Sequence, residues 1–172
     1  MSPTDVRPID PLSDAEIAVV ADRMRLTLIE VVGAARGGSM YTPEWLRARV
    51  RFHLDPNACE GAVFVATQGG MIVGHTIVRV EHEDGARFGL FSTTYVDPAH
   101  RRHGVAEALL DRGEAWLGER RVDALVTDTS QANAKLIALF QKRGYAVVFR
   151  SDELGMLRLS RPVSPRADRP SP

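Results

Sequence analysis

The sequence is poor in cysteine, in net charge and in long apolar runs, and each shortage excludes a class of protein. Cys59 is the only cysteine among 172 residues, so neither an intramolecular disulfide nor a cysteine-rich zinc site can form. Lys and Arg number 22, as do Asp and Glu, so no overall charge favours nucleic acid as a partner. No apolar run approaches the roughly 18 residues of a membrane span. Residues 1–9 lack the basic and apolar regions of a signal peptide. We therefore expect a cytoplasmic protein that binds neither nucleic acid nor membrane.

The remaining composition is that of an ordinary globular domain. Hydrophobic residues make up 44% of the chain and charged residues 26%, which is enough apolar material for one sizeable core. We expect a single domain over residues 1–161. The tail 162–172 is rich in proline and polar residues, and we expect it to be disordered.

Two helices are predicted in the first third of the chain, after a short strand near residues 6–9. Ser13 and Glu16 form a capping box, from which apolar residues recur at helical spacing as far as Val32 and are ended by glycine. Thr42 and Pro43 start a second helix, which runs to about Leu54.

A change of period then predicts a sheet. Strand-like runs at 62–67, 71–81 and 87–96 are separated by tight turns, so these three strands are expected to pair antiparallel. A helix at 105–119, a strand at 124–129, a helix at 132–143 and strands at 145–149 and 156–159 follow. Strand, helix, strand in succession implies a right-handed crossover and a parallel pair. The fold class is therefore α/β (α+β), with a mixed, mostly antiparallel sheet of six to seven strands and about four helices.

The most informative segment joins the strand ending at Val96 to the helix starting near Val105. It passes through Pro98 and a basic stretch into a small residue, Gly104, directly before the helix. Backbone N–H groups and the positive end of a helix dipole then converge on one spot, which is an anion site. The alternative is that this is a solvated basic turn. The spacing matches neither a nucleotide P-loop nor a dinucleotide fingerprint, so ATP and NAD are poor candidates.

This segment resembles the pyrophosphate loop of the GNAT superfamily of acyl-CoA-dependent N-acyltransferases, whose form is Arg/Gln-x-x-Gly-x-Gly/Ala. Residues 101–106 fit that form, and Val96-Asp97-Pro98 matches the strand end that usually precedes it. A second family motif, Asn-x-x-Ala-x-x-Leu-Tyr-x-x-x-Gly-Phe, resembles residues 133–145, with Phe140 in place of the tyrosine. The order of elements also agrees, so the resemblance covers residues 6 to about 159.

The resemblance implies acetyl-CoA as co-substrate, no metal, and a splayed pair of parallel strands that admits the cofactor. Backbone amides of the loop would hold the pyrophosphate, and the strand edge at 94–96 would pair with the pantetheine arm. The Thr94 N–H would face the thioester carbonyl. The implied cofactor-binding residues are Tyr95, Val96, Arg101, Arg102, His103, Gly104, Val105, Ala106, Asn133 and Phe140.

Two departures from the family pattern concern catalysis. The strand 88–96 carries no carboxylate, and a phenyl ring at Phe140 cannot protonate a leaving thiolate. The base must therefore come from elsewhere or be water. The candidates, each of which is also an ordinary surface charge or core histidine, are His75, Glu81, His82, Glu83, Glu30 and Glu44.

The resulting hypothesis is an N-acetyltransferase that acts on a primary amine of a small molecule or peptide. The alternative is a CoA-binding regulatory or partner-binding domain that has lost turnover, and a third possibility is a phosphate-binding module unrelated to CoA. Pairing of edge strands into a homodimer remains open.

Overall fold

A computed structural model describes residues 3–163. The helices are α1 (Asp14–Val32), α2 (Ala34–Ser39), α3 (Pro43–Leu54), α4 (Val105–Gly118) and α5 (Ala134–Lys142), with a 3-10 turn η1 (Pro98–His100). The strands are β1 (Asp5–Pro8), β2 (Gly61–Gln68), β3 (Met71–Glu83), β4 (Ala86–Val96), β5 (Ala124–Ser130), β6 (Ala146–Ser151) and β7 (Met156–Pro162).

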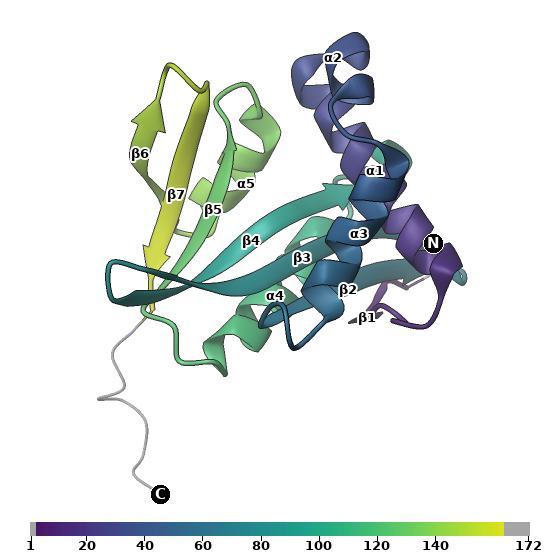
Figure 1. Ribbon diagram of the computed structural model, residues 1–172, viewed down its shortest axis with the longest axis horizontal. Coiled ribbons are helices and arrows are strands. Elements are labelled where there is room, and N and C mark those ends of the chain that lie inside the picture. Colours follow the sequence, from purple (N-terminus) through teal and green to yellow (C-terminus); the bar gives the residue numbers. More distant parts are fainter. Residues whose placement is uncertain (1–2, 164–172) are drawn as a thin grey trace, which may run out of the picture.

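The seven strands form one open sheet in the order β1-β2-β3-β4-β5-β7-β6 (Figure 1). Every neighbouring pair is antiparallel except β4 and β5, which run parallel. The predicted fold class is confirmed: seven strands lie within the predicted range of six to seven, and one neighbouring pair is parallel.

Two hydrophobic clusters cover the two faces of this sheet. On one face, which we call the α1–α3 face, α1 and α3 bury Val20 and Val50 against Val65 and Ile77. On the other, the α4–α5 face, helices α4 and α5 pack on the sheet and bury a larger cluster (Figure 1). Alternate residues of each strand point to alternate faces, so one strand supplies both clusters.

The helix starts follow the sequence signals with one exception. The Ser13 and Thr42 hydroxyls accept from the N–H groups of Glu16 and Trp45 at 3.1 and 3.0 Å, as capping residues do. The predicted return contact from Glu16 to the cap is wrong. Its carboxylate accepts instead from the Asp10 N–H at 3.1 Å and from Arg7 of β1, because the longer-range ion pair holds it away from the helix start.

Helix α2 was not predicted, since a glycine pair was expected to end the helical region. Gly33 does end α1, with φ +91°, but the chain then turns into α2. A Cβ at Gly37 would lie 2.5 Å from the Leu28 carbonyl carbon of α1. Gly37 therefore permits a close helix-to-helix approach, and the packing overrides its poor helix propensity.

The last strand of the sheet passes residue 161, where the domain was predicted to end, by one residue. Strand β7 continues to Pro162, and the Val163 N–H donates to the Asp123 carbonyl at 3.0 Å. The remaining part of the predicted tail, 164–172, lies outside the described residues.

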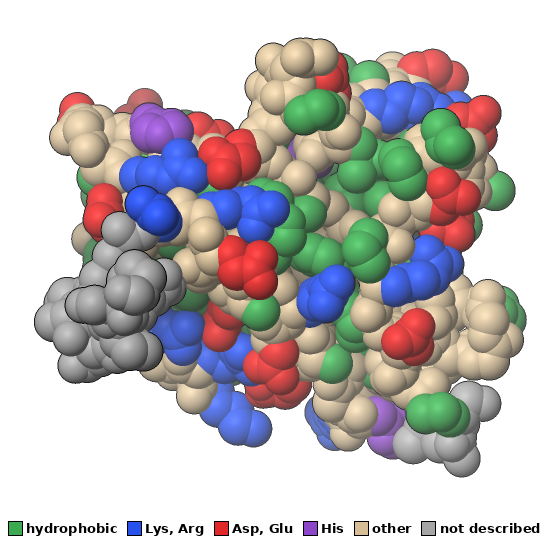
Figure 2. Space-filling view, turned by 90° about the horizontal axis from the view of Figure 1, so that it is seen from below, with side chains coloured by type: hydrophobic (Ala, Val, Ile, Leu, Met, Phe, Trp, Pro, Cys, Tyr) green, Lys and Arg blue, Asp and Glu red, His purple; other side chains and the backbone are tan. Residues whose placement is uncertain are grey.

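Acidic and basic side chains are interspersed on the face shown in Figure 2, where neither sign forms a continuous patch. Of the helices within residues 3–163, none combines the length and apolar character that crossing a bilayer requires.

Gly113 of α4 tests how tightly this helix sits on the sheet. A Cβ there would lie 2.6 Å from the ring of Phe91 and 3.2 Å from Val78, both in the core. Gly113→Ala is therefore expected to lower the free energy of unfolding by about 1–3 kcal/mol, as overpacking does.

The matched control is Gly118→Ala in the same helix, where a Cβ meets nothing within 4 Å. It should be neutral or stabilise by up to about 1 kcal/mol through helix propensity. Urea titrations of both variants measure the difference, and equal effects would contradict the packing argument.

Candidate functional site

The site is built around the point where β4 and β5 separate. These strands pair only from Phe88 to Phe91 on β4 and from Ala124 to Thr127 on β5. Beyond these residues β4 continues to Val96 and β5 to Ser130 without pairing with each other, which opens a fork in the sheet (Figure 1).

A β-bulge coincides with the start of the fork. Between β3 and β4 the register passes from Ile77↔Thr93 to Val78↔Phe91, so Ser92 is an extra residue on β4. A bulge bends its strand and increases its twist. Directly at this bend, the buried Thr127 hydroxyl donates to the Phe91 carbonyl at 3.1 Å. The last paired residues are thereby fixed while the strands beyond them diverge.

A pocket occupies the fork. Residues 94–96 of β4 form its floor, α1 contributes one wall and α5 the other. A second pocket adjoins it along the loop before α4, and the two share lining residues on β4, the loop and α5. The residues common to both are Val96, Arg101, Ala106 and Leu139. One channel thus runs from the fork to the start of α4.

The far end of this channel has the geometry of an anion site. Gly104 is the residue before α4 and has φ +81°, and no side chain caps the helix. The first hydrogen bond of α4 runs from the Ala108 N–H to the Gly104 carbonyl at 3.0 Å. The amides before Ala108 therefore have no acceptor within the helix, and the positive end of the dipole faces the second pocket. Arg102 also lines it, with φ +64°.

Arg101 is engaged in holding the site together. Its Nε donates to the Val96 carbonyl at 2.8 Å, and its guanidinium pairs with Glu30 of α1 at 2.8 Å while lying over the Tyr95 ring. A second ion pair, bidentate, joins Arg23 of α1 to Asp97 at 2.9 Å. Two partly exposed ion pairs therefore tie α1 to the segment that follows β4.

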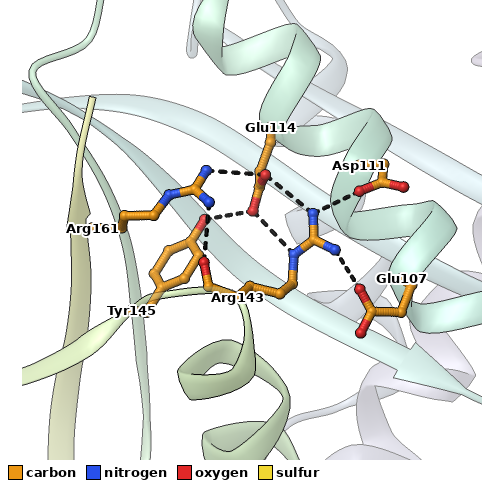
Figure 3. A network of polar contacts seen from close by, with 6 residues as sticks. All are labelled: Glu107, Asp111, Glu114, Arg143, Tyr145 and Arg161. Atoms are coloured by element: carbon orange, nitrogen blue, oxygen red, sulfur yellow. Dashed lines mark hydrogen bonds and ion pairs between the residues drawn. The ribbon is translucent and has the colours of Figure 1, made fainter. Parts of the chain in front are cut away.

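Helix α5 is held against α4 by a second polar network, drawn in Figure 3. Arg143 contacts the three acidic side chains of α4, Glu107, Asp111 and Glu114. Arg161 and the Tyr145 hydroxyl both reach Glu114, at 3.0 and 2.9 Å. Burial, followed by the charge of Glu114, raises the pKa of Tyr145, so its hydroxyl stays protonated and donates.

Most of the sequence-predicted cofactor residues meet in this channel. Thr94, Tyr95, Val96, Arg101, Ala106 and Asn133 line the first pocket, and Arg102, Gly104 and Val105 the second. Asn133 caps α5 by accepting from the Leu136 N–H at 3.4 Å, and its amide donates to Thr129. His103 is exposed and lines neither pocket, and Phe140 is buried between Phe91 and Tyr145.

Two of the base candidates, His75 and Glu81, are not among the residues that line the channel. His75 is fully buried, and its Nε2 lies 2.9 Å from the Thr93 hydroxyl. Glu81 pairs with Arg79 on the same strand, opposite Phe88 and outside both pockets. Of the other candidates, Glu30 lines the first pocket. Within residues 3–163, no group of three His, Cys, Asp or Glu side chains is arranged to hold a metal ion.

Residues 31–145, more than half of the chain, match the model of the acetyltransferase (GNAT) family. The chain belongs to this GNAT family. The predicted resemblance to this family is thereby confirmed. Sequence similarity to curated proteins covers a smaller part of the chain. A mycothiol acetyltransferase from Propionibacterium freudenreichii subsp. shermanii is 31% identical over 88 residues, 51% of this chain but only 28% of that relative's length.

Solved structures share the fold at low identity. The yncA protein of Salmonella typhimurium, solved with its cofactor acetyl-CoA, has a TM-score of 0.74 at 16% identity and 98% coverage of both chains. A chain of the NatC complex bound to Gag peptide and CoA has a TM-score of 0.70 at 15% identity, covering 94% of this chain and 99% of that one.

The buried state of His75 has a consequence for stability. Burial, and secondarily the charge of Arg23, lowers the pKa of His75 from 6.5 to about 3. Because the unfolded chain binds a proton near pH 6.5 and the folded chain does not, this group destabilises the fold as pH falls from 6.5 towards 3.

Replacement His75→Phe removes this proton uptake. Between pH 6 and pH 5, the variant should lose less unfolding free energy than the unmodified protein, by up to about 1.4 kcal/mol per pH unit. Urea titrations at the two pH values measure the slopes. Equal slopes would show that His75 titrates in the folded state as it does in the unfolded chain.

Proposed function

We propose that this protein is an N-acetyltransferase that transfers the acetyl group of acetyl-CoA to a primary amine of a small molecule or peptide by direct attack. The observation that carries the proposal is the continuous channel from the sheet fork to the uncapped start of α4. It offers main-chain donors for a diphosphate at one end and an unpaired strand edge at the other. That yncA was solved with acetyl-CoA, and the NatC chain with CoA, supports the same ligand here.

Different segments of the channel are assigned to different parts of acetyl-CoA. In this proposal, the amides of residues 102–106 hold the pyrophosphate, aided by the helix dipole. The pantetheine arm pairs with β4 at residues 94–96 as an added strand would. The Arg101 guanidinium already contacts the Val96 carbonyl and Glu30. Arg101 therefore supports cofactor binding indirectly, by holding β4 and α1 in place.

The chemistry requires little of the protein beyond positioning. A neutral amine nitrogen attacks the thioester carbonyl carbon, a C–N bond forms and the C–S bond breaks. The products are the acetamide and the CoA thiol, with one proton released overall for an amine that entered as its ammonium. The Thr94 N–H stabilises the transient oxyanion, and one such donor is typically worth about 3–4 kcal/mol. Phe140 has no hydroxyl that could protonate the leaving CoA thiolate. We expect this lack of a proton donor to slow the transfer.

A second candidate function is a CoA-binding domain without turnover. Two observations favour it: β4 carries no carboxylate, and Phe140 is sealed in the core between two aromatic rings. A CoA-thiol release assay against a panel of amines distinguishes the two. Amine-dependent release supports the transferase, and acetyl-CoA binding with no release from any amine supports the binding domain.

Gly104 tests the cofactor assignment. A valine at φ +81° is strained, and its side chain would project beside the amides assigned to the pyrophosphate. Gly104→Val is expected to weaken acetyl-CoA binding about tenfold or more, the equivalent of losing one charge-assisted hydrogen bond. Calorimetry with acetyl-CoA measures the change.

Gly85→Val is the matched control, because Gly85 has φ +78° and equally open surroundings in the turn between β3 and β4. Both variants should lose similar stability, but only the first should lose affinity. Unchanged affinity in a folded Gly104→Val protein would refute the pyrophosphate assignment.

A further inference from the structure

A separate pocket lies on the α1–α3 face of the sheet, over β5, β7 and β6. Its lining combines exposed apolar side chains with a compact group of charges. Those that matter for its chemistry are Glu83, Asp128, Phe149, Leu154, Met156 and Arg158. Phe149 and Leu154, which line it, are 64% and 74% exposed.

The register of the sheet places one residue of this pocket, Asp128, beside the fork. Arg79 lies opposite Leu90, which lies opposite Val126, so these three residues share the face that Ile77 presents to α1 and α3. Two residues beyond Val126, Asp128 points to the same face. It is also the first residue of β5 after Thr127, the last to pair with β4. Asp128 therefore lies at the start of the fork, on the α1–α3 face.

The charges of the pocket do not balance. Arg158 pairs with both oxygens of Asp128, at 2.7 and 2.9 Å, and its other nitrogen reaches Glu83 at 3.4 Å. One guanidinium thus faces two carboxylates, which leaves a net negative charge. The three apolar side chains Phe149, Leu154 and Met156 lie next to it. A ligand complementary to this surface carries one positive charge and an apolar group.

We propose that this pocket binds the acceptor, and that the acceptor is a primary amine on an uncharged alkyl or aryl group, with its ammonium held by Asp128. The inference rests on the proposed acetyl transfer and adds the substrate class. The apolar group lies against Phe149, Leu154 and Met156, and the nitrogen points into the fork, where the channel delivers the thioester. Asp128 binds and orients the acceptor from a different strand than the one that holds the cofactor.

The acceptor class is tested with the full chain and three amines: phenethylamine, ethylamine and β-alanine. Phenethylamine should be acetylated with a kcat/KM about tenfold or more above ethylamine, because it buries an aryl group, and β-alanine should be the poorest because its carboxylate meets Asp128 and Glu83. Preference for β-alanine, or equal rates for all three, would overturn the acceptor assignment and leave acetyl transfer in place. A protein that does not bind acetyl-CoA at all would instead overturn the proposed function itself.

Asp128→Asn and Arg158→Gln separate acceptor binding from a structural role of this ion pair. If Asp128 binds the ammonium, Asp128→Asn raises the KM for phenethylamine about tenfold or more, with the acetyl-CoA Kd unchanged. Arg158→Gln frees both carboxylates, so it lowers that KM or leaves it unchanged. If the pair only supports the fold, both variants raise KM alike, which would overturn the proposal.

Glu153→Gln is the matched control, since Glu153 is an exposed carboxylate on the turn between β6 and β7 that does not line the pocket. It should leave the KM for phenethylamine and the Kd for acetyl-CoA unchanged.

Sedimentation tests the other possible occupant of the pocket, a second copy of the chain. A dimer that Leu154→Asp dissociates without altering the acceptor KM would show that the pocket is an interface, contrary to the proposal.

Discussion

The separation of β4 from β5 is the constraint on which the rest of this structure depends. Parallel neighbours in a sheet normally satisfy each other's backbone groups along their length. Here the extra residue Ser92 bends β4 at the place where pairing with β5 stops, and the Thr127 hydroxyl satisfies the Phe91 carbonyl at that point. The strand edge beyond is open in the middle of the sheet rather than at its margin. A ligand that pairs there is held on both sides by the domain's own core elements.

Keeping such a fork open requires that its walls be fixed without filling it. Helix α1 is tied to the segment after β4 through Arg23–Asp97 and Glu30–Arg101. Helix α5 is tied to α4 through Arg143, whose three acidic partners lie along one face of α4 (Figure 3). Isolated exposed ion pairs contribute little to stability, but a network around a partly buried guanidinium fixes geometry. Of these residues, Glu30, Arg101 and Glu107 line the channel, and their partners hold their charged groups against its walls.

Local signals in the sequence were sufficient to locate one end of the site and insufficient for the other. The glycine before α4, the proline turn and the helix start are all set within a few residues, so the geometry of this loop could be predicted from residues 96–106. The bulge at Ser92 could not, because it is a mismatch between two strands and appears only when both are paired. The same holds for the ion pair of Arg101, because its partner Glu30 is distant in sequence. His75 was a candidate by residue type alone, and its burial depends on the packing of α1 over β3.

Strand β4 carries no carboxylate, but the neighbouring strand β5 carries one, Asp128. A reaction that joins two substrates at a fork can receive charged or polar groups from either strand, since both strands border the fork. On β4 the residues near the fork offer main-chain donors and hydroxyls, which suit a developing oxyanion. On β5 the first residue past the last pair is Asp128, and the neighbouring β7 adds Arg158 opposite it. A carboxylate on β5 can meet an ammonium without lying against the thioester oxygen, where its charge would oppose the oxyanion. In the proposed transfer, main-chain donors on β4 and a carboxylate on β5 would therefore stabilise the oxyanion and the ammonium at the same time.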